Sequence, residues 1–324
     1  MRPVRQLQAC LLLLVSLLMV TGCLSPPSPP LKLGTNLWPG YEPLYLAREQ
    51  GYLSEDKVTL VELLSASEVM RAYRNGAIDA AALTLDEVIT LREAGLRPVI
   101  VQVADISNGA DVILVRQGVV RMQDLKGHRI GVEATALGAY MLSRALALHG
   151  MTVDDVEIVH LEVNEHREAW LKGQIDAVVT FEPVRQQLLS EGARILFDSS
   201  MIPGEVVDLL VVREELLKSH RRQIEHLIHA WHQAVSHLKT SPEQAAQVMK
   251  ARLGGSVEDV LNSLEYLDLP GTDMSAELMQ GAPAELEQQA RRLAESMLDQ
   301  GLLRQLPDLT GLVYRHYPSH EADH

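Results

Sequence analysis

The chain has 324 residues, of which 47% are apolar and 22% are charged. That is enough apolar material for one large domain or two ordinary ones. The formal charge is −14, from 29 Lys and Arg against 43 Asp and Glu. Because binding to a phosphate backbone needs a basic surface, this charge argues against a nucleic-acid partner. The two cysteines imply no disulfide framework.

The first 30 residues resemble an export signal followed by a tether. Two arginines precede the apolar run Ala9–Val20, which is too short to span a bilayer comfortably. Val20-Thr21-Gly22-Cys23 resembles a bacterial lipobox, which predicts a signal peptide over residues 1–22 and a lipid on Cys23. An ordinary signal peptide with a chance cysteine is the alternative. Residues 23–30 are proline-rich and predict an extended tether. The leucine after Cys23 slightly favours the outer membrane of a diderm bacterium, by the rule for lipoproteins.

Between residues 31 and 115, strand and helix patterns alternate. Strands are predicted at Leu31–Thr35, Lys57–Leu63, Asp79–Thr84, Pro98–Ala104 and Asp111–Val115. Helices are predicted at Pro43–Gln50, Ser67–Asn75 and Leu85–Ala94, and each ends beside a Gly or Asn, as helix C-caps favour. This alternation favours a largely parallel sheet with helices on both faces.

The pattern then starts again. A short helical turn is predicted at Met122–Leu125, strands at His128–Val132, Val156–Leu161, Ile175–Thr180 and Arg194–Phe197, and helices at Ala136–His149, Asn164–Lys172 and Pro183–Ser190. This second unit, residues 116–205, has about 90 residues, the size of a small domain. Val206–Val212 predicts a returning strand, and the chain after it is expected to be helical to about residue 303. The predicted organisation is lobe 1 (31–115 and 206–324, with a helical C-terminal extension) and lobe 2 (116–205), joined by two crossovers.

Four stretches, in this order, resemble the type II periplasmic solute-binding proteins, in the branch that serves nitrate, sulfonate, taurine and thiamine-pyrimidine ABC importers. They are LGTNLWPGYEPLYLAREQGYL (33–53), VMRAYRNGAIDAAALTLDEV (69–88), VADISNGADVILV (103–115) and DLKGHRIGVEATALGAYML (124–142). VVTFEPV (178–184) is a fifth, weaker match. The resemblance covers roughly residues 31–251. It implies a two-lobed α/β fold with mixed, mostly parallel sheets, and an ABC permease and ATPase as partners.

The loops after the predicted strands are expected to form the ligand site, because ligands of open α/β sheets bind beyond the carboxyl ends of the strands. The loop Asn36–Glu42 places Trp38 and Tyr41 there, two flat rings with a polar edge that suit a small, partly apolar ligand. The same rings could instead only pack the first helix against the sheet. The expected ligand contacts are Asn36, Trp38, Tyr41, Thr84, Asp105, Thr135, Ala136 and Glu182.

Thr135 and Ala136 belong to this set because they open a predicted helix. The free backbone N–H groups of that helix could hold an acidic group of the ligand. The hydroxyl of Thr135 could equally serve only as the helix N-cap.

Acidic residues dominate the predicted loops, and no Lys or Arg falls within them. These acids are Asp105, Asp111, Glu133, Glu182 and, near the return crossing, Asp208. A simple anion would meet a negative field there, whereas a carboxylate binds an ammonium or ring N–H through a charge-assisted hydrogen bond. The sequence therefore predicts a small polar organic ligand that contains an amine or NH group, such as an aminosulfonate or aminopyrimidine. Glu182 and Asp105 are its expected main contacts, unless these acids only cap helices. Asp111 and Asp208 are expected to support the hinge or the cleft.

No catalytic, cofactor or metal site is predicted. HEADH (320–324) has the letters of a zinc-protease motif, but it lies at the end of the chain without a third ligand. Four histidines at positions 226, 229, 232 and 237 are expected mainly on a solvated helix face. The sequence contains no nucleophile elbow, phosphate loop or dinucleotide fingerprint.

The sequence thus predicts a lipid-anchored solute-binding protein at the periplasmic face of a bacterial membrane, anchored through Cys23. Ligand would favour a closed state, reached by hinge motion, that an ABC importer reads. The alternative is a sensing accessory that presents its closed form to a membrane receptor or signalling enzyme. An enzyme on the same fold is a third possibility, opposed by the lack of a metal-binding His/Cys cluster in the predicted loops.

Overall fold

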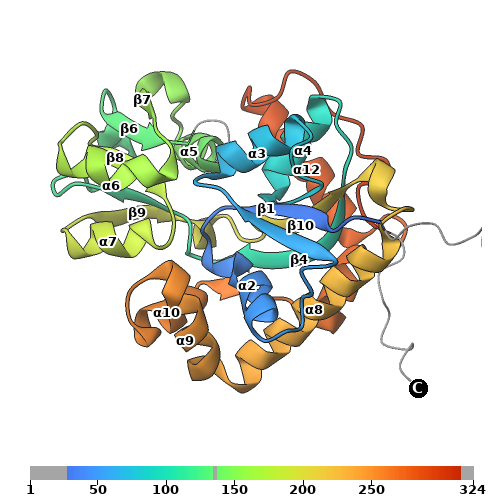
Figure 1. Ribbon diagram of the computed structural model, residues 1–324. Helices are drawn as coiled ribbons and strands as arrows, with labels where there is room; N and C mark the ends of the chain where they lie inside the picture. Colours follow the sequence, from blue (N-terminus) through green and yellow to red (C-terminus); the bar gives the residue numbers. More distant parts are fainter. Residues whose placement is uncertain (1–27, 134–136, 315–324) are drawn as a thin grey trace, which may run out of the picture.

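The computed structural model describes residues 28–133 and 137–314, and these form two α/β lobes side by side (Figure 1). The sheet of lobe 1 has the strand order β11-β4-β10-β3-β1-β2. Its strands are β1 (Leu31–Thr35), β2 (Val58–Glu62), β3 (Ala80–Thr84), β4 (Pro98–Ser107), β10 (Val207–Arg213) and β11 (Leu267–Asp268). β1 pairs in parallel with β2 and β3, and β10 runs antiparallel between β3 and β4. The sheet is therefore mixed, as expected.

The sheet of lobe 2 has the order β7-β6-β8-β5-β9. Its strands are β5 (Val112–Val115), β6 (Arg129–Val132), β7 (Glu157–His160), β8 (Ala177–Thr180) and β9 (Arg194–Asp198). β6 pairs in parallel with β7 and β8, whereas β5 pairs antiparallel with β8 and β9. The two-lobed α/β architecture predicted from the sequence is confirmed.

The chain crosses between the lobes twice, at residues 108–111 and 199–206. The first crossing comes earlier than the boundary at residue 115 expected from the sequence, because β5 pairs within the second sheet. The two crossings touch, since Ser199 Oγ lies 2.7 Å from Ser107 Oγ and accepts the N–H of Gly109 at 2.7 Å. This cross-linked pair of connections is the hinge.

Helices cover both sheets (Figure 1). In lobe 1 they are α2 (Glu42–Glu49), α3 (Ala66–Arg74) and α4 (Leu85–Glu93); in lobe 2, α5 (Leu137–Leu148), α6 (Val163–Leu171) and α7 (Val184–Ser190). Short 3₁₀ turns are η2 (Pro39–Tyr41), η3 (Met122–Leu125), η4 (Val153–Asp155), η5 (Ser199–Met201) and η6 (Glu214–Leu216). Local chemistry explains several starts: Ser65 Oγ caps α3 by accepting the N–H of Glu68, and Glu87 reaches back to the N–H of Thr84 at the start of α4.

The C-terminal extension wraps around lobe 1. Its helices are α8 (Arg221–Thr240), α9 (Pro242–Leu253), α10 (Val257–Leu264), α11 (Thr272–Met279) and α12 (Glu285–Asp299). α8 packs against α2, and α12 packs against α4, so the extension does lie across lobe 1 as the sequence suggested. The expectation that this region is helical throughout is wrong at β11, which pairs with the end of β4.

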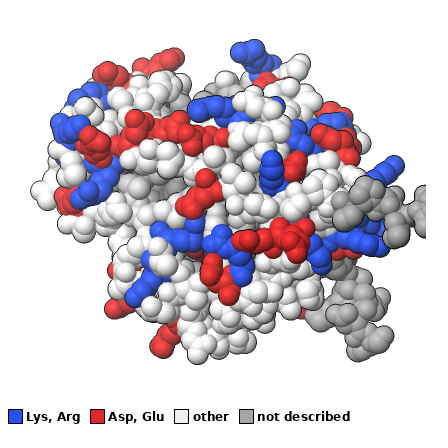
Figure 2. Space-filling view, viewed as in Figure 1, with Lys and Arg blue, Asp and Glu red and all other residues white. Residues whose placement is uncertain are grey.

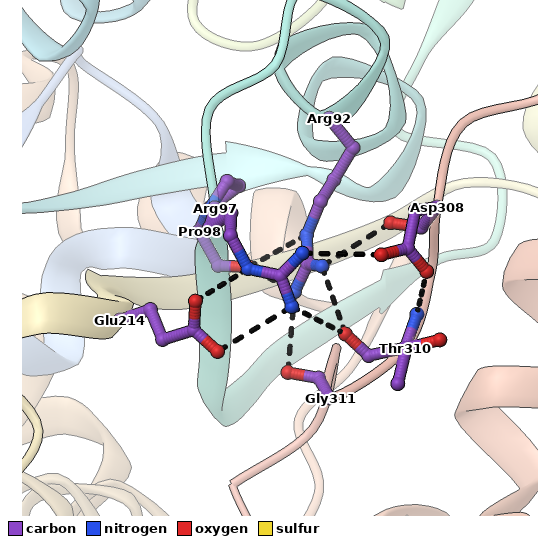
Figure 3. Close-up of polar contacts among 7 residues, drawn as sticks. All are labelled: Arg92, Arg97, Pro98, Glu214, Asp308, Thr310 and Gly311. Atoms are coloured by element: carbon purple, nitrogen blue, oxygen red, sulfur yellow. Dashed lines mark hydrogen bonds and ion pairs between the residues drawn. The ribbon is translucent and has the colours of Figure 1, made fainter.

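The segment after α12 is fixed to lobe 1 by a buried arginine (Figure 3). Arg92 donates hydrogen bonds to the carbonyl oxygens of Asp308, Thr310 and Gly311. The neighbouring Arg97 pairs with Glu214 and Asp308 nearer the surface. Residue 314 therefore ends in a docked position against β4, where its N–H is donated to the carbonyl of Ile100.

The histidine-bearing face of α8 is less solvated than expected. His226 Nε2 accepts the N–H of Ser54 at 3.0 Å, and His237 Nδ1 lies 3.0 Å from the hydroxyl of Tyr52. Both side chains are half-buried, because the loop after α2 lies over this face. His229 is exposed as predicted.

The surface carries both signs of charge. On the face shown in Figure 2, Lys and Arg lie interleaved with Asp and Glu across both lobes. This distribution agrees with the acidic net charge in offering no basic stripe on that face for nucleic acid. In the described residues, no helix has the length and apolar character needed to cross a membrane.

Candidate functional site

A pocket lies between the lobes, at the carboxyl ends of the strands. It is lined from lobe 1 by Asn36, Trp38, Tyr41, Ala66, Thr84 and Glu87, from lobe 2 by Glu133, Leu137, Gly138, Met141, His166, Val179, Thr180 and Phe181, and from the crossings by Asp111 and Asp208. The cavity volume is about 40 Å³, room for about three waters. The structure is thus a nearly closed form, and a solute would displace water and widen the cleft.

The aromatic wall of the pocket joins the two lobes. The rings of Trp38 in lobe 1 and Phe181 in lobe 2 meet edge to face, with centroids 5.4 Å apart and planes at 89°. Trp38 donates its indole N–H to Asp105 Oδ2 at 3.0 Å, and the Tyr41 hydroxyl donates to Asp208. Both ring edges are thereby fixed by buried carboxyls, which leaves the ring faces to shape the pocket.

The loop that carries these rings is short because Pro39 opens the 3₁₀ turn η2. Gly40 lies directly behind Trp38. A Cβ at this position would be 1.8 Å from Asp105 Oδ2 and 2.4 Å from Trp38 Nε1. The glycine is therefore required for the Trp38–Asp105 hydrogen bond.

Gly40→Ala is expected to break that hydrogen bond and displace the Trp38 ring. We expect a loss of about 1–3 kcal/mol in the free energy of unfolding, as for other overpacked sites, and weaker ligand binding. Chemical denaturation and ligand titration measure the two effects. Gly271→Ala is the matched control, because a Cβ there meets only Lys239 Nζ at an ordinary 3.6 Å. Equal behaviour of the two variants would contradict the role given to Gly40.

Four carboxyl groups line the pocket, and no Lys or Arg is among its described lining residues. They are Glu87, Asp111, Glu133 and Asp208, and each is at most 5% exposed. Burial raises the pKa of Glu87 to about 8, with the charge of Asp86 adding to the effect. Burial also raises the pKa of Asp111 to about 7 and raises the pKa of Glu133. A cation bound among them would supply the charge that the protein does not.

Asp208 and Asp105 form the floor beneath the aromatic wall. In the sheet, Asp208 is flanked by Asp105 on β4 and Thr84 on β3. Burial raises the pKa of Asp105 to about 8, and burial together with the charge of Asp105 raises the pKa of Asp208 well above its usual value. These two acids sit too close to ionise together without a nearby positive charge.

Two buried oxygens in the pocket make no hydrogen bond within the described part of the chain. They are Asp111 Oδ2 and Glu133 Oε2. A buried acceptor without a partner costs about 1–3 kcal/mol. Because both oxygens belong to pocket-lining side chains, a ligand N–H donor between them would remove that cost.

The expected site residues are brought together only in part. Asn36, Trp38, Tyr41 and Thr84 line the pocket. So do Asp111 and Asp208, for which the sequence suggested hinge or cleft support. Asp105 lies behind Trp38, outside the lining residues, and orients the indole. Thr135 and Ala136 lie outside the described residues, as does Cys23.

Glu182 lies away from this pocket. Its Oε1 is 2.8 Å from Arg185 Nη1, in a buried ion pair, and its Oε2 accepts the N–H of Gln186. Arg185 in turn lies over the ring of Tyr266, 4.3 Å from its centroid. Glu182 borders a smaller hollow with Pro39, Gln186 and Asp259. It therefore supports contact between α7 and the C-terminal extension.

Sequence reasoning missed two polar residues of the pocket, Glu87 and His166. Glu87 follows Thr84 at the capping-box spacing, so it was detectable as a residue at a helix start that faces the predicted site. His166 lies on α6, and its Nδ1 is 3.1 Å from Thr180 Oγ1. Burial lowers the pKa of His166 to about 4, so it lines the pocket as a neutral ring. No local motif marked it.

Solved structures share this architecture. The alkanesulfonate-binding protein SsuA from Xanthomonas axonopodis pv. citri, bound to MOPS, superposes with a TM-score of 0.78 over 90% of this chain and all of that one, at 20% identity. The periplasmic aliphatic sulphonate binding protein SsuA from Escherichia coli gives a TM-score of 0.72 over 90% and 93% of the two chains, also at 20% identity. These similarities show the two-lobed periplasmic-binding-protein type II fold.

Sequence comparison points the same way. The taurine-binding periplasmic protein of Escherichia coli K12 is 24% identical over 159 residues, which are 48% of this chain and 49% of that protein. The chain spans about half the length of the first curated relatives it matches. The description of the NMT1-like family fits a much longer stretch, residues 24–253. Since that stretch is well over half of the chain, the protein belongs to the NMT1-like family.

Proposed function

We propose that the protein is an extracytoplasmic solute-binding protein that delivers a small organic ligand to an ABC importer. The two lobes, the hinge of two crossings and the pocket between them provide the machinery for capture by closure. The names of the similar proteins support this role, since they describe periplasmic binding of taurine and sulfonates. In this proposal the permease and ATPase are partners, and Cys23 carries the lipid anchor at the periplasmic face.

The ligand in this proposal carries an amine or an NH-rich ring, as in an aminosulfonate or an aminopyrimidine. The observation that carries it is the set of four buried carboxyls without a lining Lys or Arg among the described residues. Asp111 Oδ2 and Glu133 Oε2 are its acceptors, because they are buried in the pocket and without partners. Trp38, Tyr41 and Phe181 provide the apolar faces for the remainder of the molecule.

A thermal-shift screen of amines, aminopyrimidines, aminosulfonates and alkanesulfonates tests this function. A ligand that binds only the folded state raises the melting temperature, and we expect members of the first three classes to do so. Asp111→Asn should lower the affinity for such a ligand by about tenfold or more, because it removes one charged acceptor. Isothermal titration gives the affinity.

Asp259→Asn is the matched control. Asp259 also bridges the lobes, through a 2.7 Å hydrogen bond from Gln186 Nε2, but it lies outside the pocket. Its replacement should leave the affinity within a few-fold of the unmodified chain. A screen without any hit, or a hit that Asp111→Asn leaves unchanged, would count against the proposed function.

A further inference from the structure

Two helices begin at the edge of the pocket, and each receives a glutamate from the opposite lobe. Glu87, on α4 of lobe 1, accepts the N–H of Leu137 at the start of α5 in lobe 2, at 3.4 Å. Its other oxygen accepts the N–H of Thr84 at 2.9 Å. One carboxyl thus takes two backbone donors, one from each lobe.

Glu133 makes the reciprocal contact. It follows β6 in lobe 2, and its Oε1 accepts the N–H of Ser67, in the first turn of α3 in lobe 1, at 2.6 Å. Glu87 is 2% exposed and Glu133 is 5% exposed, and both line the pocket. Each lobe therefore places its own negative group on a helix start of the other lobe.

Backbone N–H groups at a helix start are the donors that a sulfonate, phosphate or carboxylate uses in a protein. Here those donors already have carboxyl partners inside the closed cleft. A second anion would have to displace a buried glutamate and would then lie beside Asp111 and Asp208. The unpartnered Asp111 Oδ2 and Glu133 Oε2 add acceptors, which repel an anion and attract a donor.

We infer that Glu87 and Glu133 are specificity-determining residues that exclude anionic groups, so that the pocket takes organic cations or neutral N–H donors in preference to alkanesulfonates. This inference rests on the proposed function and narrows its ligand class. It separates the chain from similar proteins that are named for sulfonates. The internal glutamates occupy the places that the anionic group of such a ligand would need.

The test compares two probes of the same size and opposite charge, 1-butanesulfonate and 1-butylamine, on the full chain. Thermal shift and isothermal titration are run on the unmodified protein, Glu87→Ala, Glu133→Ala and the double variant. We expect the unmodified protein to respond to butylamine and not to butanesulfonate. The double variant should gain about tenfold or more in affinity for butanesulfonate, because backbone donors in both lobes become free.

Glu162→Gln is the matched control, since Glu162 also crosses between the lobes, accepting the hydroxyl of Ser65 at 2.6 Å, but does not line the pocket. It should keep the preference of the unmodified protein. If the alanine variants fail to fold, Glu87→Gln and Glu133→Gln keep the side-chain volume and remove the charge, and the same gain is expected.

Folded glutamate variants that still ignore butanesulfonate would overturn the inference, and so would an unmodified chain that prefers butanesulfonate to butylamine. If either occurs while butylamine binding depends on Asp111, the inference alone fails. If Asp111→Asn leaves the binding of every probe unchanged, the proposed pocket itself fails.

Discussion

Replacing Arg92 with leucine is expected to lower the free energy of unfolding by about 3–5 kcal/mol. Arg92 is 4% exposed and donates five hydrogen bonds to backbone carbonyls (Figure 3). Two of them go to Pro98 at the start of β4, and three go to the segment 308–311. Leucine would leave these carbonyls without a donor in a region where water does not reach.

The same substitution should release the C-terminal segment. Ile100 on β4 donates its N–H to Leu312 and accepts the N–H of Tyr314, both at 2.8 Å, so the segment is held as a short parallel addition to the sheet. Without Arg92 this pairing has little to hold the approach to it. Denaturant unfolding gives the stability change, and hydrogen exchange over residues 305–314 reports the release.

Arg97→Leu is the control for this prediction. Arg97 contacts Glu214 and Asp308 on the same segment, but its side chain is 39% exposed. Exposed ion pairs contribute about 1 kcal/mol or less, so this variant should stay near the stability of the unmodified chain. Equal losses in the two variants would show that surface charge, and not the buried carbonyl contacts, holds the segment.

The two-lobed fold was predictable because its signals are local. Apolar runs followed by Gly-capped helices recur through the first 200 residues, and β1 has the same bounds in the structure as in the prediction. The lobe boundary was not predictable to the residue. Val112–Val115 is a plain apolar run that fits either sheet, and only its pairing with β8 and β9 places it in lobe 2.

The site was predictable as a set of loops, but the duties of individual acids within it were not. Asp105, Asp111 and Asp208 all lie near strand ends, and the sequence ranks them by type and position alone. Their roles depend on which neighbour each side chain meets: Asp105 meets the Trp38 indole, whereas an oxygen of Asp111 remains unpartnered. Glu182 was misplaced for the same reason, because Arg185, one helical turn later, pairs with it.

The pocket-lining set also shows why composition of the loops was a useful guide to charge. Loops without Lys or Arg predicted an acidic cleft, and the described lining residues indeed have carboxyls and no basic side chain. What composition could not show is that Glu87 and Glu133 each reach across the cleft to a helix of the other lobe. Those contacts exist only in the closed arrangement of the two lobes.

These buried acids should make the ligand-free protein less stable as the pH rises. A carboxyl with a raised pKa in the folded state holds its proton more tightly than the unfolded chain does. Its contribution is complete below the unfolded pKa near 4 and is lost as the pH passes the folded value. Burial raises the pKa of Glu87 and of Asp105 to about 8, and that of Asp111 and of Glu42 to about 7. The loss therefore falls largely between pH 6.5 and 8.5.

We expect the free energy of unfolding of the ligand-free protein to fall by on the order of 2–4 kcal/mol across that window. Other groups do not mask the fall: His166, whose pKa burial lowers to about 4, and Asp308, whose pKa hydrogen bonds from Thr310 lower to about 2, keep one charge state there. Asp111→Asn should flatten the slope, because asparagine cannot ionise, whereas Asp308→Asn should leave it unchanged. Denaturant unfolding at a series of pH values measures the slope, and a flat curve for the unmodified chain would mean that these carboxyls are already charged and compensated in the ligand-free pocket.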